Sequence, residues 1–172
     1  MATTILLVSA ARLDGLVPAL TELLKEAVNG GASLGFLPPV TLEEGRGYWL
    51  SVRRELLLGN RLLLVARSDG RVAGAGQLTL PAWPNARHRA EVQKVFIDAG
   101  LRGRGIGRAL MSALHDTARI RGRSLLLLHT RHGGPAERFY KTLGYRPVGL
   151  IPGYTRGPAG ESYDDLTLYL EL

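Results

Sequence analysis

The sequence predicts an α/β fold with a mixed, mostly antiparallel central sheet flanked by about four helices, within a single domain over residues 1–172. Short apolar runs alternate with segments whose apolar residues recur at helical spacing, which is typical of a sheet covered by helices. The length of 172 residues and the hydrophobic content of 45% suit one core, and the chain is too short for two ordinary domains.

The first half of the chain is expected to hold two helices and three strands. Thr41 and Glu44 have the spacing of a capping box, which predicts that a helix begins there. Asp69 and Gly70 lie between two strand-like runs and are typical of a hairpin turn, so those strands should be antiparallel neighbours. In order, the predicted elements are a strand over 3–10, a helix over 13–28, a helix over 41–59 and strands over 62–67 and 72–80.

The second half is expected to alternate strands and helices. A glycine-rich loop separates a strand from a helix that ends at Gly122, and a second helix begins at Pro135 and ends at Gly144. This order places a strand, loop and helix unit at the centre of the fold. The predicted elements are a strand over 89–97, a helix over 105–121, a strand over 125–128, a helix over 135–143 and two closing strands over 148–151 and 166–170.

The charge of the chain narrows the choice of partners. The net charge is +7, and nineteen of the 22 cationic residues are arginine, whose planar guanidinium suits phosphate. The arginines are scattered and aromatic residues make up only 6%, whereas a nucleic-acid surface would show basic runs with interleaved aromatics. The charge therefore favours a phosphorylated small ligand over nucleic acid.

The chain contains no cysteine, which excludes disulfides, thiolate metal sites and a cysteine nucleophile. No apolar run approaches the roughly 18 residues of a membrane span, and the N-terminal segment lacks the basic region of a signal peptide. We therefore expect no membrane association and a cytoplasmic location.

The most informative segment is residues 95–108, which places glycines and arginines between the end of a strand and the start of a helix. Backbone N–H groups at a helix N-terminus have no partner within the helix, and the helix dipole there favours negative charge. Glycines let oxygen atoms approach those N–H groups and allow the dihedrals of an anion-binding turn. The segment is therefore predicted to hold a diphosphate, with Arg102, Arg104 and Arg108 at its rim.

Two common phosphate-binding loops are excluded by spacing. A Walker A loop needs Gly-Lys-Ser/Thr, which the chain lacks. The dinucleotide-binding loop needs a third glycine where Arg108 stands. What remains is the pattern Arg102-x-x-Gly105-x-Gly107, which by itself also fits a glycine-rich turn that only enters a helix.

This pattern, preceded by the strand Val95-Phe96-Ile97 and followed by a helix, resembles the coenzyme A motif of the GNAT superfamily of N-acetyltransferases. The segment from Pro135 to Tyr145 is similar to the closing motif of that superfamily, with Ala136 and Tyr140 in the expected places. The earlier helix pair and hairpin fit the N-terminal half of the superfamily. The resemblance therefore implies a GNAT-like fold over nearly the whole chain.

Two further segments, residues 30–36 and 89–94, are similar to tabtoxin-resistance acetyltransferases. This similarity suggests a role in antibiotic or toxin resistance without naming a substrate. Two positions depart from the expected pattern: Gly133 stands where many members of the superfamily have Asn, and His129 stands where that branch would have an acid.

The resemblance implies that acetyl-CoA is the cofactor. Backbone N–H groups near residues 95–97 would hold the acetyl carbonyl, where the strand must part from its neighbour to admit pantetheine. The expected cofactor-binding residues are Val95, Phe96, Ile97, Arg102, Gly103, Arg104, Gly105, Ile106, Gly107, Arg108 and Ala136.

Direct acetyl transfer requires that the amine lose a proton and that the departing thiolate gain one. By the resemblance, Glu91 is the expected general base, acting directly or through a water; the alternatives are a solvated strand carboxylate or a partner of Arg89 or Lys94. Tyr140 matches the general acid of the superfamily, and the alternative is a core aromatic beside Phe139.

Candidate substrate contacts are Phe36, Trp49, His129 and Tyr154, although each also has an interpretation as a core, strand-end or turn residue. The spacing of His129 and His132 occurs in metal sites, but no third ligand is evident nearby, so no metal is expected.

The sequence therefore predicts an enzyme that transfers an acetyl group from acetyl-CoA to the primary amine of a small molecule, either amino-acid-like or an antibiotic or toxin. A protein or peptide amine is the alternative acceptor, and a non-catalytic basic module that binds coenzyme A or RNA is a remoter alternative. Many members of the superfamily pair, so a homodimer is a further expectation.

Overall fold

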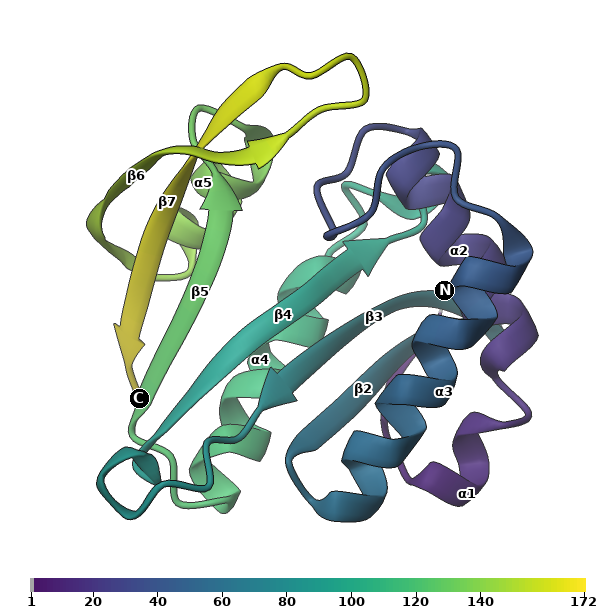
Figure 1. Cartoon of the computed structure of the whole chain (residues 1–172). Coiled ribbons are helices and arrows are strands. Elements are labelled where there is room, and N and C mark those ends of the chain that lie inside the picture. The colour runs from purple at the N-terminus through teal and green to yellow at the C-terminus, as the bar shows by residue number, and fades with distance from the viewer. Residues whose placement is uncertain (1) are drawn as a thin grey trace.

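The computed structural model describes residues 2–172 and contains a seven-stranded sheet with helices on both faces (Figure 1). The strand order is β1-β2-β3-β4-β5-β7-β6, and neighbouring strands are antiparallel except for β4 and β5, which are parallel. The predicted mixed, mostly antiparallel α/β sheet is thus confirmed. The strands are β1 (Thr3–Val8), β2 (Arg61–Ser68), β3 (Arg71–Thr79), β4 (Arg89–Ile97), β5 (Leu125–Arg131), β6 (Arg146–Arg156) and β7 (Ser162–Glu171).

The helices divide between the two faces of the sheet. Alternate residues of β2 enter different cores, so that Leu64 packs on the same side as α4 and α5, whereas Leu63 packs with α1, α2 and α3. None of the helices within residues 2–172 combines the length and the apolar character needed to cross a membrane. The helices are α1 (Ala10–Leu13), α2 (Val17–Asn29), α3 (Leu42–Leu58), α4 (Ile106–Ile120) and α5 (Pro135–Thr142), with short 3-10 turns at Pro84–Ala86 and Ala99–Leu101.

Two local signals predict their elements correctly. Thr41 Oγ1 accepts a hydrogen bond from the Glu44 N–H (3.1 Å), and the Glu44 carboxylate accepts one from the Thr41 N–H (2.8 Å), so the capping box that starts α3 is present. Asp69 and Gly70 both have positive φ in the turn between β2 and β3, as a type I′ hairpin turn requires.

The helix expected over residues 13–28 is in fact two helices. α1 ends at Leu13 and α2 begins at Val17, with Pro18 in its first turn, because proline lacks the N–H that a helix interior requires. Leu13 and Leu20 are both fully buried on the two sides of the break. The apolar spacing therefore continues across it and does not reveal it.

Three strands are longer than predicted. The strand expected over 125–128 continues to Arg131, and those expected over 148–151 and 166–170 belong to the longer β6 and β7. The added residues are mostly polar or exposed, so no hydrophobic run marks them. The extension of β5 brings His129 into the sheet.

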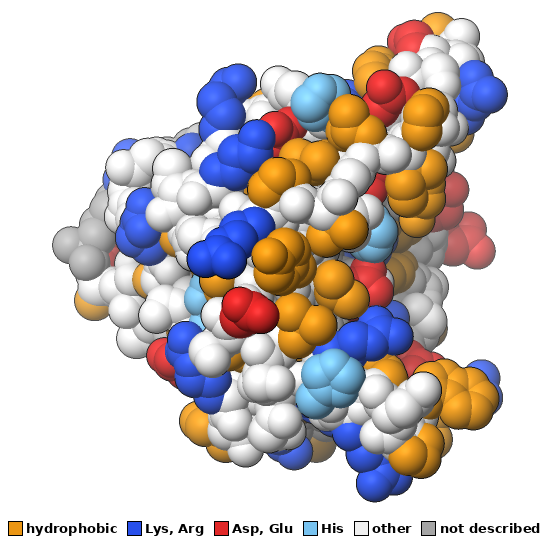
Figure 2. Space-filling model, turned by 90° about the vertical axis from the view of Figure 1, so that its left-hand side faces the viewer, with side chains coloured by type: hydrophobic (Ala, Val, Ile, Leu, Met, Phe, Trp, Pro, Cys, Tyr) orange, Lys and Arg blue, Asp and Glu red, His pale blue; other side chains and the backbone are white. Residues whose placement is uncertain are grey.

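The β6 edge of the sheet exposes apolar side chains. Val148, Leu150, Ile151 and Tyr154 are 41–63% exposed. The space-filling view shows hydrophobic side chains gathered among lysines and arginines that are spread over this face (Figure 2). The cationic residues on this side of the molecule are therefore dispersed and do not form one basic patch.

Glu137 holds the turn that leads from β5 into α5. Its carboxylate accepts hydrogen bonds from the Lys141 ammonium (2.6 Å) and the Gly133 N–H (2.7 Å), and lies 3.1 Å from Nδ1 of His132. The Lys141 bond, followed by the Gly133 bond, lowers the pKa of the Glu137 carboxyl. Its negative charge in the first turn of α5 is also favoured by the helix dipole.

Replacing Glu137 with Gln should lower the free energy of unfolding at neutral pH by about 1–2 kcal/mol, because a neutral amide loses charge-assisted hydrogen bonds. Since the folded-state pKa is lowered, this stability is present above the ordinary carboxyl pKa and is lost as the pH falls through the folded value. Denaturant unfolding at neutral pH and at about pH 3 tests this. The difference in the free energy of unfolding between parent and variant should be smaller at the acidic pH. An equal difference at both pH values would contradict a stabilising role of the Glu137 charge.

The matched control is Glu22→Gln. Glu22 forms a pair with Lys25 at 3.5 Å in which both side chains are at least one-third exposed. Such exposed pairs contribute little, so this variant should change the free energy of unfolding by less than about 0.5 kcal/mol.

Candidate active site

The pairing of β4 and β5 stops partway along the two strands. The last pair in register is Val92 with Leu128, and both strands continue beyond it; Figure 1 shows them parting there. Residues 93–97 and 129–131 therefore do not form with each other the backbone hydrogen bonds that neighbouring parallel strands normally share. The sheet is therefore open at its centre.

A β-bulge changes the course of β4 beside this opening. Ala75 pairs with Phe96 and Gln77 pairs with Gln93, so β4 has one residue more than β3 over this stretch. Lys94 lies in the bulge with a φ of 51°, which is uncommon for a residue with a side chain. The bulge turns Lys94 toward the opening, where it lines a cavity.

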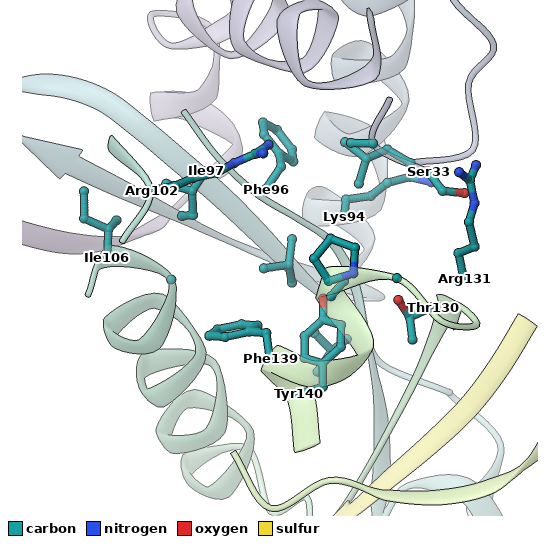
Figure 3. Close-up of a pocket in the computed structure, with 18 of the residues that line it drawn as sticks. Ser33, Lys94, Phe96, Ile97, Arg102, Ile106, Thr130, Arg131, Phe139 and Tyr140 are labelled. Atoms are coloured by element: carbon teal, nitrogen blue, oxygen red, sulfur yellow. The ribbon is translucent and has the colours of Figure 1, made fainter. Parts of the chain in front are cut away.

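This cavity has a volume of about 620 Å³. It extends from the glycine loop before α4, between β4 and β5, to residues 30–34 after α2. We refer to these limits as the α4 end and the α2 end. Figure 3 shows Arg102 toward the α4 end, Arg131 toward the α2 end and Tyr140 between them. The cavity therefore connects the two faces of the sheet.

The lining of the cavity is cationic. Among the described residues that line it, four are Lys or Arg and none is Asp or Glu. An anionic ligand would therefore be attracted along the whole length of the cavity. The four cations are Lys94, Arg102, Arg108 and Arg131.

The α4 end has the features of an anion-binding helix N-terminus. Gly105 is the N-cap of α4 with a φ of 82°, and Gly103 has a φ of 75°, conformations that favour glycine. A Cβ added to Gly107 would lie 3.4 Å from Cζ of Phe139, so glycine keeps this part of the wall free of a side chain. The first N–H groups of α4, with Arg102 and Arg108 nearby, fit a diphosphate.

The structure brings most of the predicted cofactor-binding residues together. All of them line the cavity except Arg104, which is not part of its wall. Their role in binding stays a prediction. The members that line the cavity are Val95, Phe96, Ile97, Arg102, Gly103, Gly105, Ile106, Gly107, Arg108 and Ala136.

The two residues predicted to transfer protons are placed differently. Tyr140 lines the cavity with its hydroxyl pointing inward (Figure 3), and burial raises the pKa of this phenol to about 12. It therefore stays protonated at neutral pH and can donate. Glu91 is not part of the wall; its Oε1 accepts a hydrogen bond from Nε2 of Gln93 (2.8 Å), which does line the cavity. Glu91 thus lies one side chain away from the cavity.

Lys94 is half-buried near the α2 end. Its ammonium lies 5.8 Å from the centre of the Phe36 ring and 5.9 Å from that of Tyr48. Burial, followed by the charge of Arg61, lowers the pKa of Lys94, while the Glu91 carboxylate opposes this shift. An anionic group entering the cavity would compensate this poorly solvated cation.

The four predicted substrate contacts have different positions. His129 lines the cavity, and Tyr154 stacks on its ring with the centroids 5.9 Å apart. Phe36 does not line the cavity, and the centre of its ring lies 5.8 Å from the Lys94 ammonium. Trp49 is fully buried among side chains of α2 and α3. The structure therefore places Trp49 in the core and away from the cavity.

The motifs do not identify several polar residues of the wall. Gln93 and Lys94 follow the last paired residue of β4, and Thr130 and Arg131 lie near the end of β5. Ligands of open α/β sheets commonly bind beyond the carboxyl ends of adjacent parallel strands. In the sequence, polar residues directly follow the paired parts of β4 and β5. This pattern is the signal that could have identified these positions.

Comparison with known proteins gives the family. A model of the acetyltransferase (GNAT) domain matches residues 59–147. The chain is 32% identical over 114 residues to a streptothricin acetyltransferase from Streptomyces lavendulae, a match that covers 66% of this chain and 58% of that protein. The chain spans 62% and 58% of the length of the first two curated relatives that it matches.

Solved structures share the fold over nearly the full length. The ribosomal-protein-alanine N-acetyltransferase from Brucella melitensis has a TM-score of 0.79 at 26% identity, covering 98% of this chain and 99% of that one. The protein yncA from Salmonella typhimurium, solved with its cofactor acetyl-CoA, has a TM-score of 0.79 at 24% identity, covering 100% of this chain and 95% of that one. Because the family model matches more than half of the chain and includes both the glycine loop and α5, the chain belongs to the GNAT family of acetyltransferases.

Proposed function

We propose that this chain transfers the acetyl group of acetyl-CoA directly to the primary amine of a small molecule. The observation that carries the proposal is the continuous cavity, which joins the anion-binding N-terminus of α4 to the released edge of β4 and to Tyr140. Acetyl-CoA, when bound, supplies the thioester that the amine attacks. The N–H groups of residues 105–108, with the guanidinium groups of Arg102 and Arg108, would hold its diphosphate.

The released edge of β4 is suited to an extended chain that contains amides. Residues 93–97 offer alternating N–H and C=O groups toward the cavity, as a sheet edge does. A pantetheine arm lying between β4 and β5 would satisfy these groups. An N–H near residues 95–97 would then face the acetyl carbonyl and stabilise the negative charge that develops on its oxygen.

Tyr140 serves as the proton donor to the departing sulfur. Its hydroxyl points into the cavity between the two ends, and burial keeps the phenol protonated by raising its pKa to about 12. A thiolate left in this partly desolvated position would be costly. Proton donation from Tyr140 removes that charge as it forms.

Glu91 takes a proton from the ammonium form of the acceptor. The nitrogen lone pair becomes available for attack only after this proton has left. Gln93 lies between Glu91 and the cavity, so the proton travels through a water. The carboxylate also compensates the neighbouring Lys94 charge.

A small acceptor is favoured by the 32% identity to a streptothricin acetyltransferase. The 26% identity to a ribosomal-protein-alanine acetyltransferase, and the 33% identity over 111 residues to the N-alpha-acetyltransferase RimI of Mycobacterium tuberculosis, make a peptide N-terminus the competing acceptor. A solved structure that is 26% identical, with a TM-score of 0.76, carries the name of a phosphinothricin N-acetyltransferase. The test is therefore release of free coenzyme A from acetyl-CoA with streptothricin, phosphinothricin and a peptide that begins with alanine. Turnover of either small molecule supports the proposal, and turnover of the peptide alone contradicts the small acceptor. Binding of acetyl-CoA without release in any assay would favour the non-catalytic module.

Glu91→Gln should lower kcat by about 10- to 100-fold, because the amide cannot accept a proton. The KM for acetyl-CoA should stay unchanged, since Glu91 is not part of the cavity wall. Steady-state kinetics with the best of the three acceptors measures both. Glu43→Gln, at an exposed carboxylate in the first turn of α3, is the control and should match the parent. A Glu91→Gln variant with the kcat of the parent would remove Glu91 from the mechanism.

A further inference from the structure

A histidine and carboxylate pair lies beside the cavity and has no part in the roles above. Nδ1 of His129 lies 2.8 Å from Oδ2 of Asp165 on β7 and 3.3 Å from Oγ1 of Thr167. Asp165 is only 4% exposed. The His129 ring also stacks on Tyr154 with an angle of 9° between the planes. The imidazole is therefore held in one orientation by three residues of the final hairpin.

This pair is located at the point where the sheet opens. Leu128 is the last residue of β5 that pairs with β4, and His129 follows it and lines the cavity. The His129 side chain is 34% exposed, so it can exchange protons with solvent. A buried carboxylate at Nδ1 favours the tautomer that carries its proton there. Nε2 is then the nitrogen that can accept a proton.

Acetylation of an ammonium group involves two protons of the nitrogen. A C–N bond forms and a C–S bond breaks; the nitrogen gives up two protons, the sulfur gains one, and one passes to solvent. The roles proposed above provide an acceptor for the first proton, at Glu91, and a donor to sulfur, at Tyr140. The second proton, which leaves the nitrogen as the C–N bond forms, needs an acceptor close to the amine.

We propose that His129 is a further catalytic residue, whose Nε2 accepts this second proton while Asp165 positions the ring and stabilises the imidazolium. The inference rests on the proposed function. A buried carboxylate at Nδ1 orients a histidine ring so that its Nε2 can act as a general base, as in the Ser-His-Asp triad. The exposed part of the ring then returns the proton to solvent. Glu91 also gives its proton to solvent and Tyr140 takes one back, so the net release is one proton.

Two variants test the roles of the pair, with the acceptor that gives the highest kcat/KM among streptothricin, phosphinothricin and the alanine peptide. His129→Gln should lower kcat by about 100-fold or more. It should keep the thermal stabilisation by acetyl-CoA, which reports an intact cofactor site. Asp165→Asn should lower kcat, but less than His129→Gln, because the ring remains and loses only the carboxylate that orients it.

The pH profile separates catalysis from packing. The titratable groups in contact with His129 are Asp165 on β7 and Tyr154 on β6. Lys94 on β4 and Arg131 on β5 line the same cavity, and Glu91 on β4 is linked to that cavity through Gln93. Carboxyl groups ordinarily titrate near pH 4 and histidine near pH 6.5, roughly. The acid limb is the fall of kcat/KM as the pH is lowered. If His129→Gln loses the part of this limb at higher pH and Glu91→Gln keeps it, the result supports His129 as the acceptor of the second amine proton.

His132→Gln is the matched control. His132 also has a carboxylate partner, Glu137 at 3.1 Å, but it does not line the cavity, so this variant should keep the kcat and the pH profile of the parent. A parent-like kcat and pH profile in His129→Gln would overturn the inference and leave the proposed function standing. If His129→Gln loses stabilisation by acetyl-CoA, a parent-like kcat in Asp165→Asn overturns the inference instead. A parent that acetylates none of the three acceptors overturns the proposed function and, with it, the role of His129.

Discussion

Tyr140→Phe should lower kcat by about 100-fold or more, the size expected when a general acid is removed. The variant keeps the aromatic ring, which packs against Phe139 and Tyr145, and loses only the hydroxyl that points into the cavity. Because burial raises the pKa of Tyr140 to about 12, this group stays protonated as the pH rises through neutrality. The parent should therefore show no alkaline loss of activity from Tyr140 near neutral pH.

The measurement is kcat together with the thermal shift caused by acetyl-CoA, which should be preserved in Tyr140→Phe. Tyr145→Phe is the matched control, because Tyr145 is also buried and its hydroxyl lies 3.1 Å from Nε2 of His115, outside the cavity. This control should affect stability more than kcat. Equal losses of kcat in the two variants would show that the effect of Tyr140→Phe comes from packing.

Gly105→Ala should raise the KM for acetyl-CoA by about tenfold or more, which corresponds to about 1.4 kcal/mol of lost binding. Gly105 caps α4 in the left-handed conformation, with a φ of 82°, and alanine would push the loop away from this geometry. The N–H groups that should hold the diphosphate would then no longer converge. The cost in affinity would come from the backbone, since nothing lies within 4 Å of an added Cβ.

The opposite end of the same helix provides the control. Gly122 has a φ of 70° and also has nothing within 4 Å of an added Cβ, but it does not line the cavity. Both alanine variants should lose a similar free energy of unfolding, about 1–2 kcal/mol. Gly105→Ala alone should change the KM for acetyl-CoA. A similar KM for acetyl-CoA in the two variants would show that the glycine loop does not bind the cofactor.

The sequence predicts features of the site that depend on neighbours along the chain. The spacing of Arg102, Gly105 and Gly107 lies in a single loop, and this loop does form one end of the cavity. The motif around Tyr140 lies on one helix, and that residue lines the cavity. In both cases the residues belong to one loop or one helix, whose backbone is determined by the local sequence. The place of a residue in the motif therefore also predicts where it lies in the structure.

Features that depend on strand register could not be predicted in the same way. The distance between Glu91 and the cavity follows from the end of the β4–β5 pairing at Val92, and the orientation of Lys94 follows from a bulge. Both are properties of two strands together. His129 and Arg131 extend β5 beyond its apolar run, so hydrophobicity alone does not assign them to the strand.

The cavity between β4 and β5 is lined from both faces of the sheet, so in the proposed reaction its two reactants would approach from opposite sides. A donor held over α4 and an acceptor arriving past residues 30–34 can meet only in the middle of the molecule. Neither has to leave before the other enters, so a ternary complex can form in either order. In the proposed direct transfer, no side chain of the protein would carry the acetyl group, which suits a chain without a single thiol.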